Sequence, residues 1–256
     1  MSERVAAFWC RVPSRPNFGD ALTPWLIKRL TGTYPLFVPP EDPRAKYFVT
    51  GSVIAFAGGG STVWGSGIMN RNDSISPDAT LLAVRGPLTR ARALECGVDC
   101  PTVFGDPALL LPRLYPRPRR TRPIVGVVPH FSDAPLLAAA WRESEELVMI
   151  DIQNPIEQVI DDIASCALIA SSSLHAIIVA HAYGAPAVWL KFRNLPSGDD
   201  SKFDDYYLSI GRDPATPLRV GYGELDADTL HRFAIAPPVS LDLEPLWNAC
   251  PFRDEP

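Results

Sequence analysis

Short apolar runs alternate along the chain with longer segments in which apolar residues recur at helical spacing. The short runs predict strands at residues 5–10, 47–50, 62–64, 81–84, 102–104, 124–128, 147–150, 168–170 and 187–190. The longer segments predict helices at 21–30, 86–97, 134–143, 155–166 and 174–183. Such alternation is typical of parallel sheets whose strands are joined by crossover helices. The pattern therefore predicts an α/β protein.

A segment rich in arginine and proline divides this pattern into two halves. It runs from Arg113 to Arg122 and also contains Arg117, Arg119 and Arg120. Because so much charge and proline cannot pack a core, we expect an exposed linker. We predict two Rossmann-like domains, 1–116 and 123–256, joined by a linker at 117–122, with the last helix as a candidate for packing back on the first domain. Ligands of such folds bind at the carboxyl ends of strands, and between the halves where there are two.

The bulk composition narrows the function without identifying it. With 256 residues, 46% hydrophobic and 21% charged, the chain has the composition of a soluble globular protein. A net charge of -5 gives no support for a nucleic-acid binder, which normally carries a basic face. Segment 113–122 is a local exception, and a basic patch for anionic lipid or acidic polysaccharide is the alternative to a linker there.

Cysteine usage and the absence of long apolar stretches favour the cytoplasm. The five cysteines are scattered and odd in number, which predicts small buried side chains in a reducing compartment. Cys96 and Cys100 lack a second ligand pair at zinc-like spacing, so we expect no metal site. The first residues lack the apolar core of a signal peptide, and no stretch is long enough to span a bilayer.

The segment from Ile169 to Ala176 is the strongest candidate for chemistry. An apolar run ends in three serines, and His175 then falls on the first turn of a predicted helix. A helix N-terminus offers unpaired N–H groups and a partial positive charge, so it can hold an anion. An imidazole beside it could donate or accept a proton. The alternative is that the serines are plain helix caps and His175 belongs to the core.

Polar residues follow several other predicted strands. Arg85 could grip a carboxylate or phosphate through two parallel hydrogen bonds, and a surface salt bridge is the alternative. Asp20 could accept hydrogen bonds from a sugar hydroxyl or act as a base, and a helix-starting turn is the alternative. The remaining candidates for an acceptor site or cleft are Asn17, Gly19, Ser66, Asp106 and His130.

Other histidines and aromatic residues are weaker candidates. His181 falls on a different helix face from His175 and is expected to be structural, whereas His231 is expected to be solvated. Aromatic rings can stack on sugars, and the candidates are Trp64, Trp189, Tyr206 and Tyr207, although the core is the default for Trp189.

Seven of these segments, in this order, resemble the polysaccharide pyruvyl transferase family, most closely the xanthan ketal pyruvate transferase type. They are N-F-G-D-A-L at 17–22, T-V-W-G-S-G-I at 62–68, A-V-R-G-P at 83–87, G-D-P at 105–107, V-P-H-F at 128–131, S-S-S-L-H at 171–175 and K-F-D-D-Y-Y at 202–207. The resemblance implies a GT-B-like fold of two domains facing across a cleft. It also implies phosphoenolpyruvate as the donor and a sugar hydroxyl pair of an exopolysaccharide, or of its lipid-linked precursor, as the acceptor.

The resemblance also assigns roles to individual residues. It implies that His175 and Arg85 bind the donor and take part in catalysis, with Ser172, Ser173 and Leu174 beside them. One position departs from the family, because Ala176 stands where glycine is usual. His175 would be the general acid/base, and Asp20 would deprotonate or orient the acceptor hydroxyl. No metal or cofactor is expected, since phosphoenolpyruvate is a substrate.

Two other functions fit the same pattern. A nucleotide-sugar glycosyltransferase of the same architecture would also place an anion at a helix N-terminus. A non-catalytic glycan-binding scaffold would bind oligosaccharide without turning over a donor. In each case we expect no nucleic-acid partner. Membrane contact would be at most peripheral, through 113–122 at the inner face.

Overall fold

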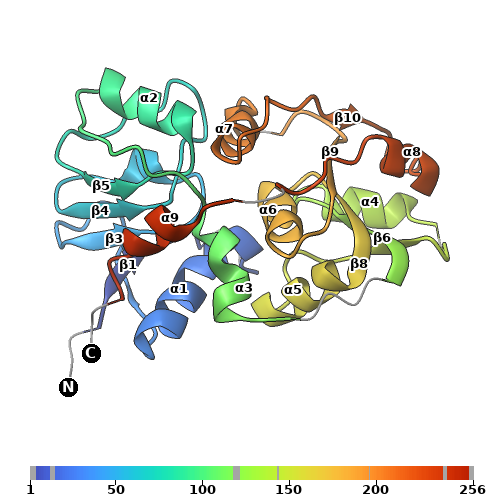
Figure 1. The fold of residues 1–256 in the computed structure, drawn as a ribbon, viewed down its shortest axis with the longest axis horizontal. Helices are drawn as coiled ribbons and strands as arrows, with labels where there is room; N and C mark the ends of the chain where they lie inside the picture. Colours follow the sequence, from blue (N-terminus) through green and yellow to red (C-terminus); the bar gives the residue numbers. More distant parts are fainter. Residues whose placement is uncertain are drawn as a thin grey trace. The chain divides into compact units, whose positions relative to one another are not determined.

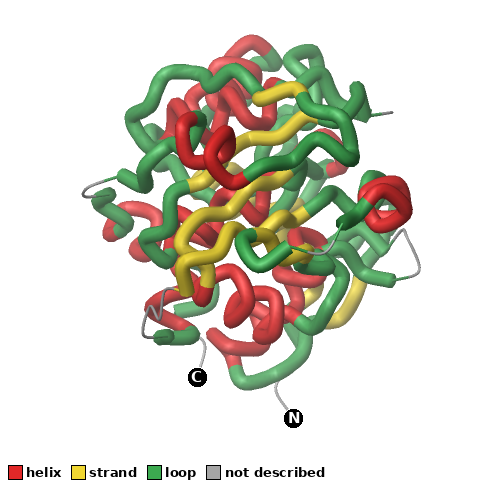
Figure 2. The backbone as a smooth tube through the Cα atoms, turned by 90° about the vertical axis from the view of Figure 1, so that its right-hand side faces the viewer, coloured by secondary structure: helices red, strands yellow, loops and turns green. Residues whose placement is uncertain are grey.

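The computed structural model describes residues 4–11, 15–117, 122–142, 144–195, 197–238 and 241–253. The chain forms two compact units. Unit 1 is drawn from Met1–Pro107, Ser197–Pro214 and Leu241–Pro256, and unit 2 from Ala108–Pro196 and Ala215–Ser240. Figure 1 labels most of the helices and strands of each unit, and Figure 2 distinguishes the strands from the helices by colour.

Unit 1 is built on a five-stranded parallel sheet with the order β2-β1-β3-β4-β5. Its strands are β1 (Ala6–Phe8), β2 (Leu36–Phe37), β3 (Lys46–Phe48), β4 (Ser61–Trp64) and β5 (Thr80–Ala83). Its helices are α1 (Phe18–Thr31), the 3₁₀ helix η1 (Ile54–Phe56), α2 (Pro87–Glu95), α7 (Ser201–Ser209) and α9 (Glu244–Asn248). Gly32 ends α1 in a left-handed conformation, φ 77°, which glycine adopts without steric cost.

Unit 2 is built on a second five-stranded parallel sheet with the order β10-β9-β8-β6-β7. Its strands are β6 (Arg122–Val128), β7 (Leu147–Met149), β8 (Cys166–Ser171), β9 (Ala187–Lys191) and β10 (Leu218–Arg219). Its helices are α3 (Leu111–Leu114), α4 (Ala134–Ala140), α5 (Ile156–Ser165), α6 (Leu174–Ala182) and α8 (Ala227–Arg232). The chain passes from unit 1 to unit 2 within the 3₁₀ helix η2 (Pro107–Leu110).

The central strands of unit 2 are buried on both faces, as in other parallel sheets. Val125, Val127, Leu168 and Val188 face one way and pack with Leu137 of α4 and Leu230 of α8. Successive side chains of a strand point to opposite faces, so the alternate residues face α5 and α6. Every residue of α6 from 174 to 181 is buried, which makes this helix the centre of the unit.

The predicted α/β class is confirmed, since the protein has two parallel sheets joined by helices. Most predicted strands and helices are also confirmed to within a few residues. The predicted strand at 102–104 is wrong, because only a single bridge joins Phe104 to Val84. The prediction missed the two-residue edge strands β2 and β10, which carry too little pattern to be recognised.

The division of the chain differs from the predicted domains 1–116 and 123–256. Unit 2 already begins at Ala108, and the end of α3, Arg113 and Leu114, lies in the segment expected to be an exposed linker. Helix α7 belongs to unit 1, although it follows strands of unit 2 in sequence. The last helix, α9, also belongs to unit 1, as the candidate packing on the first domain anticipated. The Trp64 indole N–H donates to the carbonyl of Leu246 at 2.9 Å, which ties α9 to strand β4.

The arginine-rich segment is described only in part. Arg113, Arg117 and Arg122 are exposed, as expected, whereas 118–121 lie outside the described residues. The Arg117 side chain pairs with Asp161 of α5 at 2.7 Å and lies over the ring of Tyr115. These local contacts of Arg117 neutralise part of the positive charge with which the segment would attract an anionic lipid or an acidic polysaccharide.

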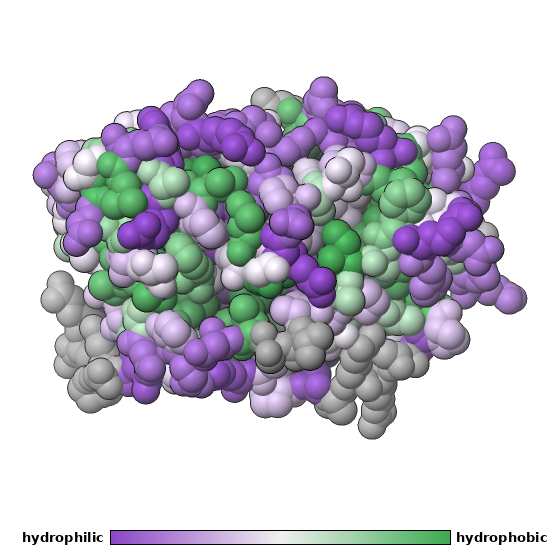
Figure 3. All heavy atoms as spheres, turned by 45° about the horizontal axis from the view of Figure 1, so that its top comes forward, coloured by the Kyte–Doolittle hydropathy of each residue, from purple (hydrophilic) through white to green (hydrophobic). Residues whose placement is uncertain are grey.

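One face of the molecule carries hydrophilic and hydrophobic side chains interspersed (Figure 3). Large exposed hydrophobic residues are scattered over both units: Tyr34, Leu36, Phe56, Leu94, Leu136, Val148 and Phe233. Among the described residues, no helix has the length and hydropathy needed to cross a bilayer.

The packing of β6 gives a test of the unit 2 core. A Cβ at Gly126 would lie 2.7 Å from Ile169 Cδ1 and 2.9 Å from Ile150 Cδ1. We expect Gly126→Ala to lower the free energy of unfolding by about 1–3 kcal/mol, the usual cost of overpacking. Gly58→Ala is the matched control, since nothing lies within 4 Å of a Cβ there. Urea unfolding measures both; equal effects would contradict the packing.

Candidate active site

The start of α6 follows directly from strand β8 through the three serines. The Ser171 hydroxyl donates to the carbonyls of Val128, at 2.5 Å, and Ser173, at 3.1 Å, and it accepts from the Ser173 N–H at 2.8 Å. Ser173 is the N-cap residue in an extended conformation, but its side chain makes no capping hydrogen bond. The first N–H groups of α6 therefore lack the usual side-chain cap and keep the polarity that attracts an anion.

His175 lies on the first turn of α6 and is only 9% exposed. Side chains of an α-helix lean toward its N-terminus, so the imidazole lies toward the serine segment. Little solvent water therefore reaches the ring. The same burial is also what a core histidine would show. The neighbouring Ala176 is fully buried, so its methyl group packs inside unit 2.

A network of polar groups surrounds Ser172 at the carboxyl edge of the sheet. The Ser172 hydroxyl accepts from the backbone N–H of His130 and donates to the Asp133 carboxylate, each at 2.9 Å. His130 follows β6 and Ser172 follows β8, and these strands are neighbours. The backbone N–H of Ser132 donates to His130 Nδ1 at 3.3 Å, which makes Nδ1 the accepting nitrogen.

Arg193 brings a positive charge to this network from the end of β9. Its Nε donates to Asp133 Oδ1 at 2.9 Å, and its Nη2 donates to the Ser132 carbonyl at 2.8 Å. The Asp133 carboxylate is buried, and its hydrogen bond raises the pKa of Arg193. The arginine side chain is 37% exposed, so part of the guanidinium faces solvent. Arg193 follows a predicted strand as Arg85 does, and the same argument could have identified it from the sequence.

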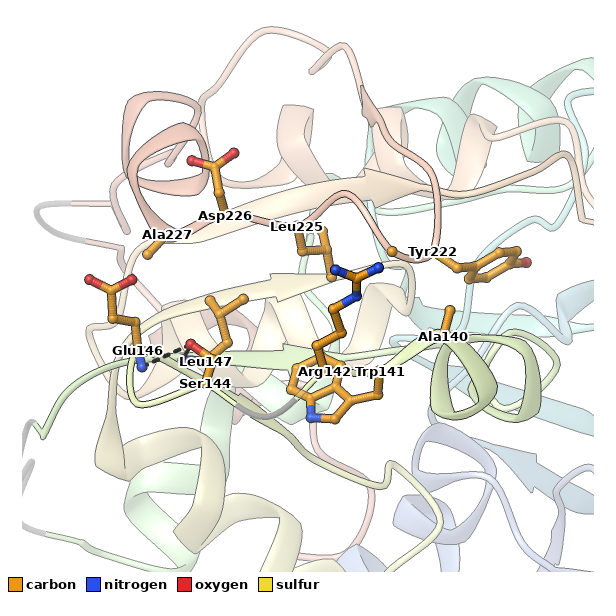
Figure 4. Close-up of a pocket in the computed structure, with 11 residues that line it drawn as sticks. Ala140, Trp141, Arg142, Ser144, Glu146, Leu147, Tyr222, Leu225, Asp226 and Ala227 are labelled. Atoms are coloured by element: carbon orange, nitrogen blue, oxygen red, sulfur yellow. Dashed lines mark hydrogen bonds between the residues drawn. The ribbon is translucent and has the colours of Figure 1, made fainter.

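A pocket of about 200 Å³ lies beside this network in unit 2 (Figure 4). Trp141, Arg142, Glu146 and Asp226 are among its lining residues. Tyr222 also lines it, but its ring extends away from the other labelled side chains, and its hydroxyl donates to Asp133 Oδ1 at 3.3 Å. No sequence pattern indicated this pocket, because its walls come from separate segments at 140–142, 144–147 and 222–227.

In unit 1, Arg85 is fully buried and bonded to protein groups. Its Nε donates to Asp205 Oδ2 at 3.2 Å, its Nη1 to Ser52 Oγ at 2.8 Å and its Nη2 to the Ile68 carbonyl at 2.5 Å. Asp205 also accepts from the N–H and hydroxyl of Thr89, at 3.0 and 2.7 Å. Arg85 is therefore an internal anchor for α7 and not a surface salt bridge. An enclosed guanidinium gives no geometric support to the expected direct grip on the donor.

The other unit 1 candidates divide into two groups. Asn17 precedes α1 and its amide donates to Asp20 Oδ2 at 3.2 Å, so these two side chains lie together. The carbonyl of the buried Gly19 accepts from Thr50 Oγ1 at 2.8 Å. Ser66 and Asp106 are fully buried, and the Ser66 hydroxyl donates to the Gly51 carbonyl at 2.9 Å. The structure thus presents neither Ser66 nor Asp106 to a ligand.

The aromatic candidates are core residues. Trp64, Tyr206 and Tyr207 are fully buried, so the prediction that they stack on sugars is wrong, and burial raises the pKa of both tyrosines. Trp189 is buried, as expected.

The remaining titratable candidates have ordinary surroundings. The buried His181 shares a hydrogen bond with the Ile235 carbonyl, whereas His231 is exposed. Burial raises the pKa of Cys100 to about 11. In the part of the chain that the structure describes, no group of three or more His, Cys, Asp or Glu could hold a metal.

Comparison with known proteins places this site in context. A family model described as polysaccharide pyruvyl transferase matches residues 17–192, which include the start of α1, Arg85, His130 and the α6 segment. An uncharacterized protein of Acanthamoeba polyphaga mimivirus, L143, is 27% identical over 208 residues. That match covers 76% of this chain and 71% of the viral protein.

The burial of Arg85 makes a prediction about stability. We expect Arg85→Ala to lower the free energy of unfolding by about 3–5 kcal/mol, because it leaves the buried Asp205 carboxylate without its cation. Arg44→Ala is the control, since Arg44 pairs with Asp42 at the surface of the same unit and should change little. Denaturant unfolding measures both variants. An Arg85→Ala protein of ordinary stability would restore a direct donor role as the simpler explanation.

Proposed function

The chain belongs to the polysaccharide pyruvyl transferase family, and from this premise we propose that it uses phosphoenolpyruvate to form a pyruvate ketal on a sugar. Family membership makes the protein a pyruvyl transferase for polysaccharide. The proposal adds the donor and the product. The acceptor would be a hydroxyl pair in an exopolysaccharide or in its lipid-linked precursor, and inorganic phosphate would be released.

The observation that carries the proposal is a largely buried imidazole at an uncapped helix N-terminus, with an arginine network beside it. His175 supplies the titratable group, and the first N–H groups of α6 supply the anion-binding site. Arg193 is held at the same sheet edge by Asp133, which in turn holds Ser172. Phosphoenolpyruvate combines a carboxylate, a phosphate and a carbon that must accept a proton, so it suits these three elements.

The proposed reaction begins with proton transfer from protonated His175 to C3 of the enol group. C2 then carries oxocarbenium-like positive charge, and one sugar hydroxyl forms a bond to it and loses its proton. The C2–O bond to phosphate breaks with its electron pair leaving on phosphate. The second hydroxyl then bonds to C2, loses its proton and closes the ketal ring. General acid/base catalysis of this kind typically contributes on the order of 10²–10⁴-fold.

Different protein groups bind the two anionic ends of the donor and the acceptor. Ser172, Ser173 and Leu174 place the first N–H groups of α6 against one anionic end of the donor, and Arg193 contacts the other. The helix N-terminus and the arginine neutralise the departing phosphate, so the proposed steps require no metal or cofactor. Arg85 acts indirectly, by fixing α7 in unit 1. Asp20, held by Asn17, orients or deprotonates the acceptor hydroxyl.

The proposal extends to the setting of the reaction. The family resemblance supports a GT-B-like arrangement of the two units. All five cysteines are free, which supports a reducing compartment such as the cytoplasm. A lipid-linked acceptor would bring the protein to the inner face of the membrane.

His175→Ala tests the proton transfer. We expect turnover to fall at least about 100-fold, because the variant lacks the group that protonates C3. Phosphate release from phosphoenolpyruvate and mass spectrometry of the glycan report the reaction, and the melting temperature reports the fold. His231→Ala removes an exposed imidazole and should leave turnover unchanged.

Two outcomes would contradict this assignment. Near-normal turnover by a folded His175→Ala protein removes the imidazole from the mechanism. Release of nucleotide from a sugar nucleotide, without phosphate release from phosphoenolpyruvate, would identify a glycosyltransferase instead.

Arg193→Ala tests donor binding. We expect the KM for phosphoenolpyruvate to rise about tenfold or more, since charge-assisted hydrogen bonds contribute roughly 1.5–3 kcal/mol. The exposed Arg232 of α8, which lies in the same unit, is the matched control and should tolerate alanine. An unchanged KM in Arg193→Ala would mean that Arg193 only holds Asp133 in place and does not bind the donor.

A further inference from the structure

The pocket of about 200 Å³ in unit 2 combines an apolar wall with exposed polar residues (Figure 4). Trp141, Leu147 and Leu225 form the apolar wall. Each of them packs against the hydrophobic core of the unit and is still only partly buried. The pocket therefore presents an apolar surface that includes an indole ring, and this surface is supported from behind by the core.

Four exposed polar residues complete this description of the lining: Arg142, Ser144, Glu146 and Asp226. The Arg142 guanidinium and the Glu146 carboxylate form no hydrogen bond or ion pair with any residue that the structure describes. Figure 4 shows the guanidinium and the two carboxylates on different sides of the pocket. A group that only donates hydrogen bonds and groups that only accept them are thus available at separate points.

Local hydrogen bonds hold the other two polar groups in place. Asp226 Oδ1 accepts from the backbone N–H of Thr229 at 2.8 Å, which fixes the carboxylate at the start of α8. Ser144 Oγ accepts from the backbone N–H groups of Glu146, at 3.1 Å, and Leu147, at 3.3 Å. Both acceptances leave the Ser144 hydroxyl proton able to donate to a ligand.

The charges and the size of the pocket select the class of ligand. One guanidinium is set against two carboxylates, so a phosphate or a nucleotide would meet more negative than positive charge. A neutral polyhydroxyl compound can donate to the carboxylates, accept from the guanidinium and lay its C–H face on the indole. Pockets for drug-sized ligands have roughly 300–1,000 Å³, so this smaller one suits a single sugar ring.

Tyr222 connects the pocket to the polar network at the sheet edge. It lines the pocket, its hydroxyl donates to Asp133 Oδ1 at 3.3 Å, and its ring stacks on Phe192 with the centroids 4.7 Å apart. Asp133 in turn holds Ser172, and Phe192 directly precedes Arg193. One side chain therefore lies between the pocket and the groups that bind the donor in the proposed function.

We propose that this pocket binds a neutral sugar of the polysaccharide acceptor, other than the sugar that receives the pyruvyl group. Trp141 supplies the apolar contact, and Arg142 and Glu146 bind the hydroxyl groups. Contacts with a part of the substrate that does not react hold the reacting hydroxyl pair in position. The inference rests on the proposed function for one point, that the bound saccharide is the acceptor.

Calorimetric titration of the full chain without phosphoenolpyruvate tests the pocket directly. The probes are neutral oligosaccharides built from glucose, galactose or mannose, and we expect at least one of them to bind. Glu146→Gln should weaken this binding at least about tenfold, since a hydrogen bond to a charged group contributes roughly 1.5–3 kcal/mol. Glu145→Gln is the matched control, because it changes an adjacent exposed carboxylate outside the pocket lining and should bind as the unmodified protein does.

Trp141 gives a second readout of the same binding. We expect Trp141→Ala to lose the oligosaccharide and Trp141→Phe to keep most of the affinity, because phenylalanine retains an aromatic face. Since Trp141 also packs against the core, Trp141→Ala should lower the melting temperature, whereas Glu146→Gln should melt as the unmodified protein does.

Three binding results would overturn the proposal. The first is that no oligosaccharide of the panel binds. The second is that Glu145→Gln and Glu146→Gln weaken binding equally. The third is that free glutamine, a zwitterion that could pair with both Arg142 and Glu146, binds in a manner lost in Glu146→Gln while no saccharide binds.

Kinetics separate the pocket from the proposed function. Glu146→Gln should raise the KM for a saccharide acceptor about tenfold and leave the KM for phosphoenolpyruvate unchanged. If saccharide binding depends on Glu146 while no ketal forms from phosphoenolpyruvate, the proposed function fails and the pocket stands. If a ketal forms with the same acceptor KM in Glu146→Gln and the unmodified protein, the pocket proposal fails and the proposed function stands.

Discussion

Parallel pairing of every strand in both sheets is the constraint on which the rest of the structure depends. Parallel strands direct all their carboxyl ends to one edge, and the chain must leave each of them through a turn. Polar residues that follow separate strands are thereby collected without being close in sequence. His130, Ser172 and Arg193 meet in this way at the ends of β6, β8 and β9.

Buried carboxylates then hold these edges in place. Asp133 in unit 2 and Asp205 in unit 1 are both fully enclosed, and each is bonded to an arginine from a distant segment. A buried charge that lost its partner would be costly, so each acid specifies where its arginine lies. The two pairs differ in exposure. Arg85 is sealed inside unit 1, whereas Arg193 keeps part of its guanidinium at the surface, and this difference separates an anchor from a candidate ligand group.

Helix α6 is part of the core of unit 2 and also carries the candidate catalytic residue His175. Its residues are buried on all sides, so the position of His175 is set by packing and not by a mobile loop. A rigid helix that begins directly after the central strand β8 holds its first N–H groups and its imidazole in fixed relation. The cost of this arrangement is limited access, since little of the ring reaches solvent.

The sequence by itself determined the local elements and the strongest candidate for a site. Apolar periodicity and glycine or proline at element ends depend on neighbouring residues, so strands such as β6 and helices such as α6 could be predicted, and so could the serine–histidine segment. Only the tertiary structure decided that α7 returns to unit 1, that Arg85 is enclosed, that Trp64 and Tyr206 are core residues, and that Arg193 lies at a sheet edge. These facts depend on contacts between residues far apart in the chain, such as Arg85 with Asp205 or Arg193 with Asp133, and no local pattern encodes which distant partner will satisfy a buried charge.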